Sequence, residues 1–106
     1  MEHELKTDAD AFDAVKRGEK KFEIRFNDRN FNVGDLLKLR KTVHTGAEMK
    51  AGLPLYYEGE PFFVWVSHIL LGPIYGLMDG WVIMSIEPPT APTAAKSEQI
   101  IERLTI

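Results

Sequence analysis

The stretch GEKKFEIRFNDRNFNVGD, residues 18–35, combines a helix stop, a strand and two turns, and it decides the fold of the chain. Gly18 ends the helical pattern before it, because glycine readily takes the left-handed conformation found after helix C-termini. Residues 21–26 alternate strictly between charged and apolar side chains, which is the period of a half-buried strand. The runs NDRN and NVGD are typical of turns. The charged face of this strand sets an acid between two bases, formed by Lys21, Glu23 and Arg25.

Length and composition limit the class of protein. The 106 residues suffice for one domain with a single modest core, and 44% hydrophobic residues indicate a folded chain. No apolar run approaches the roughly 20 residues of a membrane span, and the polar N-terminus does not resemble a secretory signal. Zero cysteines exclude disulfides and thiolate metal sites, and fit a cytoplasmic protein. A net charge of -3 argues against a wholly basic nucleic-acid-binding surface, but it leaves room for a local basic cleft.

The residues before this stretch predict a strand and a helix. Residues 2–6 predict a first strand with Leu5 facing inward. Thr7 or Asp8 is placed to cap a helix over residues 8–17, since short polar side chains accept hydrogen bonds from the first backbone N–H groups of a helix. The apolar stripe of this helix consists of Ala11, Phe12 and Val15.

The residues after it predict further strands. Residues 36–43 alternate again, whereas 45–61 hold glycines and prolines without a period and predict a long irregular loop. Residues 62–71 are apolar on both faces, as in a central strand, and we expect His68 there to be a hydrogen-bonded core histidine. Residues 81–86 predict the last strand. Together these elements predict an α+β, mainly β fold, a small antiparallel β-barrel of about five strands with one packed N-terminal helix.

The C-terminal part differs in composition from the rest. We expect one domain over residues 1–87, followed at 88–106 by a proline- and alanine-rich linker and a short amphipathic tail. A helix that short is marginal alone. We therefore expect it to contact a protein partner or a second copy of the chain through Ile100, Ile101 and Leu104.

Several spaced motifs occur here in one order: HELK, then G-x-K-x-F-E-I-R, then NDR and VGD. In this order they resemble the ASCH domain, a branch of the PUA-like β-barrels, and in particular the small bacterial and phage ASCH-like proteins. The resemblance covers about residues 2–87 and is weaker in its second half. The residues that carry it are His3-Glu4-Leu5-Lys6, Gly18, Lys20, Phe22-Glu23-Ile24-Arg25, Asn27-Asp28-Arg29 and Val33-Gly34-Asp35, with weaker matches at 69–72 and 81–86.

The resemblance implies a cleft between the early helix and the barrel that holds RNA or a nucleotide-like ligand without a cofactor. Lys20, Glu23 and Arg25 would line this cleft, with Lys6 nearby and Arg29 at its rim. Lys20 shares strand parity with Phe22, so it reaches the charged face only if the strand begins after it.

The cluster supports more than one chemistry. Arg25 can bind a phosphate with its planar fork, and Lys20 can bind one as a point charge. Glu23 can orient these two cations or accept a hydrogen bond from a base amino group. Alternatively, Lys20 and Glu23 serve a small hydrolase, an amidohydrolase acting on a modified nucleoside or a ribonuclease. One ASCH branch is an amidohydrolase for acetylated cytidine with the motif K-x-x-T, and Glu23 stands here where that branch has its threonine nucleophile. The simplest alternative is an exposed salt-bridged strand face of little energetic consequence.

Other residues give weaker indications. Tyr56 and Tyr57 are candidates for stacking on bases, although such residues more often pack in loops. The three histidines have no metal-ligand spacing, so we expect no metal site. A further alternative function is a phage-type protein-interaction module that uses the C-terminal tail. The three histidines are His3, His44 and His68.

Overall fold

The computed structural model describes residues 1–89. Our predictions for the tail, including the roles of Ile100, Ile101 and Leu104, concern residues 90–106 and lie outside this part. The elements along the described residues are β1 (Glu2–Thr7), α1 (Ala9–Lys16), β2 (Phe22–Phe26), β3 (Leu36–Lys41), α2 (Gly46–Lys50), β4 (Phe62–Leu71) and β5 (Trp81–Glu87).

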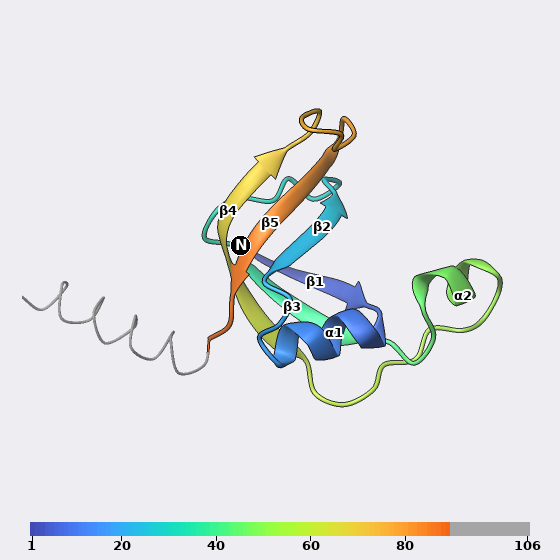
Figure 1. The fold of residues 1–106 in the computed structure, drawn as a ribbon. Helices are drawn as coiled ribbons and strands as arrows, with labels where there is room; N and C mark the ends of the chain where they lie inside the picture. Colours follow the sequence, from blue (N-terminus) through green and yellow to red (C-terminus); the bar gives the residue numbers. More distant parts are fainter. Residues whose placement is uncertain (90–106) are drawn as a thin grey trace, which may run out of the picture.

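The five strands form one curled sheet in the order β1-β3-β4-β5-β2 (Figure 1). The prediction of a mainly β fold with an early packed helix is confirmed. The prediction of an antiparallel barrel is wrong in two respects. β1 and β3 run parallel, and the edge strands β1 and β2 do not pair, so the sheet is a half-barrel. Alternation predicts that a segment is a strand, but it does not encode its partner, and here α1 and β2 intervene between the parallel strands.

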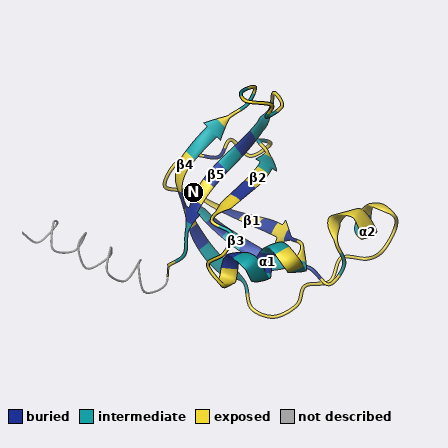
Figure 2. Ribbon diagram, in the orientation of Figure 1, coloured by how far each residue is buried: buried dark blue, intermediate teal, exposed yellow. Residues whose placement is uncertain are grey.

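The core lies on the concave face of the sheet, where α1 covers it (Figure 2). Along β1, β3 and β5 the side chains of one parity are buried and those of the other parity face outward, as the pleat requires. Within residues 1–89 no helix is long and apolar enough to cross a membrane. The buried apolar side chains are Leu5, Phe12, Val15, Phe31, Leu37, Leu39, Val64, Val66, Val82, Met84 and Ile86.

Helix α1 begins and ends almost where the sequence predicts. Gly18 has φ +81°, in agreement with its predicted role as a helix stop. Asp8 occupies the predicted N-cap position, but its side chain makes no hydrogen bond to the helix. Its Oδ1 instead accepts a hydrogen bond from the backbone N–H of Gly46, at 2.8 Å. Asp8 therefore links the start of α1 to the segment after β3.

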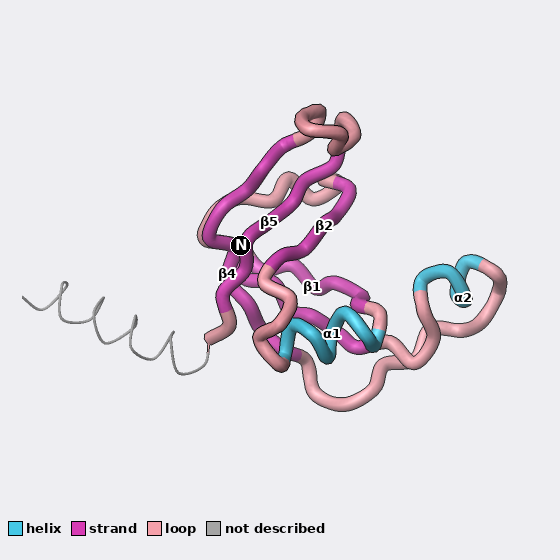
Figure 3. The backbone as a smooth tube through the Cα atoms, viewed as in Figure 1, coloured by secondary structure: helices cyan, strands magenta, loops and turns pink. Residues whose placement is uncertain are grey.

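The segment 45–61 contains a short helix that the sequence analysis did not predict. Thr45 and Glu48 form a reciprocal capping box, in which each side chain accepts a hydrogen bond from the backbone N–H of the other. The T-x-x-E spacing of this capping box was the sequence signal that could have predicted the start of the helix. α2 buries no residue, so its sequence has no apolar stripe at helical spacing that could have predicted the helix. The helix sits in an arm that projects from the sheet (Figure 3).

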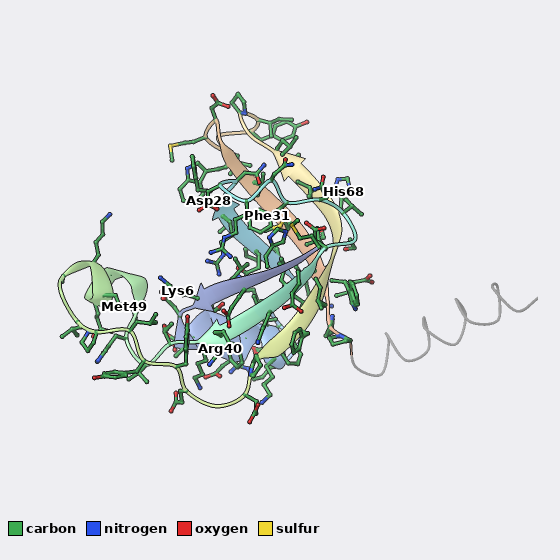
Figure 4. All side chains as sticks on the ribbon, turned by 180° about the vertical axis from the view of Figure 1, so that it is seen from behind. Lys6, Asp28, Phe31, Arg40, Met49 and His68 are labelled. Carbon is green, nitrogen blue, oxygen red and sulfur yellow. The ribbon has the colours of Figure 1, made fainter. Side chains whose placement is uncertain are left out.

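Strand β4 has the predicted bounds, but His68 is exposed rather than in the core (Figure 4). The pairing between β4 and β5 shifts between Val66 and His68. The extra residue in β4 reverses the side-chain parity beyond it, so His68 faces outward opposite Ser85. Periodicity alone does not reveal such a bulge.

Strand β2 buries its charged face and exposes its apolar face. Glu23 is 3% exposed, whereas Phe22, Ile24 and Phe26 are 45%, 46% and 54% exposed. A half-buried strand usually has the opposite orientation, because burying a charge without a partner is costly. The reason for this reversal lies in the site that Glu23 occupies.

Candidate functional site

A cavity of about 500 Å³ lies between the β1–α1 side of the half-barrel and strand β2. It occupies the region where β1 and β2 fail to pair. The structure brings all five predicted ligand-binding residues, Lys6, Lys20, Glu23, Arg25 and Arg29, to its wall. Residues that the sequence analysis did not assign to the cleft also line it, and these are Leu5, Thr7, Asp8, Ala11, Ile24, Phe26, Asp28, Phe31 and Trp81.

Glu23 is the centre of the charged wall. Its Oε1 accepts a hydrogen bond from Lys20 Nζ at 3.1 Å, and its Oε2 accepts one from Arg25 Nε at 3.0 Å. Both partners remain partly exposed, 21% for Lys20 and 26% for Arg25. The two cations compensate the charge of the buried carboxylate. The carboxylate in turn fixes both cations in position.

Lys20 reaches the charged side because β2 begins only at Phe22, which meets the condition set by strand parity. The chain turns between Gly18 and β2, and Lys20 Nζ also donates to the carbonyl oxygen of Phe22 at 2.8 Å. The ammonium lies 4.7 Å from the centre of the Phe22 ring. Three contacts therefore hold this cation at the edge of the cavity.

Two arginines bridge the unpaired edges of the sheet. Arg25 Nη2 donates to the carbonyl oxygen of Lys6 at 2.9 Å, and Arg29 Nη1 donates to that of Glu4. Both carbonyls belong to the edge strand β1, so the guanidinium groups satisfy acceptors that a neighbouring strand would otherwise satisfy. Arg25 Nη2 also lies 3.5 Å from Thr7 Oγ1. The cavity thus opens at a seam held by side chains.

The segment that carries Arg29 is fixed by a buried pair. Asp35 accepts hydrogen bonds from the backbone N–H of Asn32 at 2.9 Å and lies 2.8 Å from His3 Nε2. Burial opposes the ionisation of Asp35, but the hydrogen bonds from His3 and Asn32 outweigh it and lower the pKa of Asp35. The ring of Phe31 meets that of His3 edge-on at 4.8 Å. The sequence motifs HELK and VGD therefore meet in one structural contact.

An aromatic pair lies at the cavity where the sequence analysis expected none. Phe26 and Trp81 pair across β2 and β5, and their ring centres are 6.0 Å apart at an interplanar angle of 74°. Phe26 remains more than half exposed. Strand alternation gave no indication of this role, because Phe26 has the parity opposite to that of Glu23.

The predicted stacking tyrosines are not at the cavity. Tyr56 is exposed on the arm, and Tyr57 lies under the guanidinium of Arg40, 4.0 Å from its ring centre. The backbone of Val43 donates to the carbonyl oxygen of Tyr56, which places both tyrosines in the base of the arm. Phe26 and Trp81, rather than these tyrosines, are the aromatic residues of the site.

Metal-binding groups are sparse in the described part. Within residues 1–89 no group of three or more His, Cys, Asp or Glu side chains is arranged to hold a metal ion.

Lys6 lies opposite Arg40 on the neighbouring strand β3, at the end of β1 (Figure 4). The site is therefore described by its cations, one buried carboxylate and an aromatic pair.

Comparison with protein families gives a match over most of the chain. A search of curated proteins returns no similar sequence. The family described as a domain of unknown function, DUF3850, matches residues 2–86, which include β1 to β4, all but the last residue of β5 and the whole of the cavity wall. Because this match covers most of the chain, the protein belongs to the DUF3850 family.

Proposed function

We propose that the protein is a PUA-like module of the ASCH type that binds RNA or a nucleotide in the cavity between β1, α1 and β2. The observation that carries this proposal is the buried Glu23 carboxylate, which holds Lys20 and Arg25 at the cavity wall. Surface salt bridges do not require such burial. A site for an anionic ligand does require cations with fixed positions and free donors.

Arg25 retains donor capacity for a phosphate. Its Nε and Nη2 groups contact Glu23 and the carbonyl of Lys6, while Nη1 makes no hydrogen bond within residues 1–89. Lys20 and Lys6 add two further positive charges at the same wall. Phosphate oxygens accept strong hydrogen bonds from such groups, so a backbone phosphate is the ligand group that best fits this wall.

The aromatic pair suits the base of the same nucleotide. The ring of Phe26 is exposed beside Trp81, and a base that stacks there gains contact without regard to its identity. Glu23 supplies a buried carboxylate acceptor in the wall, which favours a base with an exocyclic amino group. We therefore expect single-stranded RNA rather than a duplex, because only unpaired bases can stack in this way.

The test measures binding of a short, fluorescently labelled single-stranded RNA of mixed sequence by anisotropy. Arg25→Ala should weaken binding about ten- to hundredfold, as expected for loss of one charge-assisted contact. The matched control is Arg40→Ala. Arg40 is equally exposed, 25% against 26%, and also pairs with a glutamate, but it does not line the cavity. The control should leave affinity nearly unchanged.

Salt dependence separates a phosphate contact from a structural effect. Loss of one phosphate contact should reduce the slope of log affinity against log salt by about 0.7 for a single strand. Circular dichroism would verify that both variants are folded at the assay temperature. Equal losses in the two arginine variants, an unchanged slope, or no binding by the wild-type protein would each contradict the proposal.

A second candidate function is a small hydrolase, and the 3.1 Å contact between Lys20 and Glu23 is the observation that favours it. Against it, the Lys20 ammonium donates to two acceptors, which suits a positioned charge better than a proton acceptor. The hydrolase predicts product formation from RNA or acetylated cytidine, measured by chromatography. Turnover that disappears in Lys20→Met while RNA affinity persists would favour the hydrolase over the binding module.

A further inference from the structure

One carboxylate in the cavity wall has no part in the phosphate and base contacts considered so far. Among residues 1–89, three carboxylates line the cavity, those of Asp8, Glu23 and Asp28. Glu23 is paired with two cations, and Asp28 Oδ1 lies 4.0 Å from Arg29 Nε. Asp8 forms no ion pair within the described residues. Because an unpaired negative charge repels phosphate, the group of the ligand that suits Asp8 is a neutral hydrogen-bond donor.

The carboxylate of Asp8 has one oxygen that is held and one that is available. Oδ1 accepts a hydrogen bond from the backbone N–H of Gly46 at 2.8 Å. Oδ2 accepts none within residues 1–89, and the residue is exposed. Aspartate at an N-cap commonly accepts from the first turn of its own helix, but Asp8 does not. Gly46 therefore fixes the direction of the carboxylate and leaves one oxygen for a ligand.

Asp8 lies next to the residues that contact the arginine proposed to bind phosphate. Arg25 Nη2 donates to the carbonyl oxygen of Lys6 and lies 3.5 Å from Thr7 Oγ1. Asp8 follows Thr7 directly at the end of β1 and, like Arg25, lines the cavity. In a nucleotide the sugar is bonded to the phosphate, so a sugar hydroxyl is the donor best placed to meet Asp8.

We propose that Asp8 accepts a hydrogen bond from the ribose 2′-hydroxyl, so that the cavity binds RNA in preference to DNA. This inference rests on the proposed function, because it assigns the sugar of the same nucleotide. The 2′-hydroxyl distinguishes RNA from DNA, and an acidic side chain accepts from it in dinucleotide-binding domains. Gly46 is a positioning residue, since its N–H acts on the ligand only through Asp8.

The arm that carries α2 thereby contributes to sugar recognition without lining the cavity. Gly46 is the first residue of α2, and no residue of 43–61 belongs to the cavity wall. The base of the arm is joined to the end of β1 by a second contact, in which the backbone N–H of Thr42 donates to the carbonyl oxygen of Thr7 at 3.0 Å. Two contacts therefore fix the arm at the residues beside the proposed sugar site.

The first test compares the affinities for two labelled single strands by anisotropy. One is RNA, and the other is DNA of the same base sequence with deoxyuridine in place of thymidine, so that the sugar alone differs. The wild type should bind RNA about tenfold more tightly, as expected for one hydrogen bond to a charged group. Asp8→Ala should remove this preference by weakening RNA binding, while DNA binding stays the same or strengthens. Asp28→Ala, the matched control at another exposed carboxylate of the wall, should keep the preference.

Substitutions of Gly46 test the positioning role and leave the cavity wall unchanged. Gly46→Pro removes the N–H donor, and this position accepts proline because it begins α2 and follows Thr45, which is extended at φ −70° and ψ 163°. Gly46→Ala keeps the N–H, and its Cβ would make an ordinary contact with Asp8 Oδ1 at 3.7 Å. The proline variant should lose RNA preference severalfold, whereas the alanine variant should keep it. Circular dichroism verifies that each variant is folded.

The outcomes separate this inference from the proposed function. Equal affinity of the wild type for the two strands would overturn the inference and leave RNA binding in the cavity intact. A preference that persists in Asp8→Ala, or that Asp28→Ala removes to the same extent, would also overturn it. Equal preferences in the two Gly46 variants would refute the positioning role. If the wild type bound neither strand, the proposed function itself would be contradicted.

Discussion

Replacing Glu23 with glutamine tests whether the buried carboxylate organises the charged wall. The substitution keeps the size of the side chain but removes the charge that compensates Lys20 and Arg25. Each charge-assisted hydrogen bond contributes about 1.5–3 kcal/mol. Both cations are partly solvated, which reduces the loss, so we expect Glu23→Gln to lower the free energy of unfolding by about 2–4 kcal/mol.

The chain offers a matched control in Glu4→Gln. Glu4 also contacts two cations, Arg40 at 3.0 Å and Lys38 at 3.9 Å, but its side chain is 48% exposed on the outer face. Exposed pairs contribute about 0.2–1 kcal/mol. The two variants therefore differ in burial much more than in the number of charged partners.

Urea denaturation followed by circular dichroism measures both free energies, by linear extrapolation. A double-mutant cycle with Lys20→Met should give a coupling of at least about 0.5 kcal/mol to Glu23. If Glu23→Gln costs no more than Glu4→Gln, the argument that burial gives this carboxylate a special role is refuted. The exposed salt-bridge interpretation of the strand would then stand.

Three further predictions follow from single contacts. Because hydrogen bonds lower the pKa of Asp35 below its ordinary value of 3.8, its ionised form stabilises the fold above that pH, and this contribution is lost as pH falls through the lowered value. The difference in unfolding free energy between wild type and Asp35→Asn, which weakens the His3 contact, should therefore shrink in acid titrations below about pH 4. Gly72→Ala should destabilise strongly in thermal melts, because its Cβ would lie 2.1 Å from the backbone oxygen of Met78. Glu48→Ala should increase hydrogen exchange in α2 but leave the global melting temperature nearly unchanged, since that helix buries nothing.

The elements that the sequence predicts well are those whose signal is local. Residues 62–71 form β4 with the predicted bounds, and Gly18 stops α1 as expected, because an apolar run and a glycine act within a few residues. The burial of Glu23 is different. It depends on Lys20 and Arg25 reaching the same carboxylate, and on β2 being an edge strand, which no alternation encodes.

Long-range pairs explain the remaining differences. The sequence presents His3 as an isolated histidine and Asp35 as a turn residue, yet they meet across 32 positions in a buried contact. Phe26 and Trp81 similarly come together only because β2 pairs with β5. Lys20 and Arg25 lie together at the cavity because they share one short motif with Glu23, whereas the aromatic residues come from two distant strands.

The open seam of the half-barrel connects stability with the proposed binding. If β1 and β2 paired directly, their ladder would occupy the space of the cavity and leave no place for a ligand. Instead, the side chains of Arg25 and Arg29 donate to the edge carbonyls of β1, and both residues line the cavity. Glu23 in turn fixes Arg25. The charged face of β2 is directed towards the cavity rather than towards a paired strand, and Glu23 is buried there. The apolar side chains of β2 therefore point to the opposite side of the strand, where they are exposed.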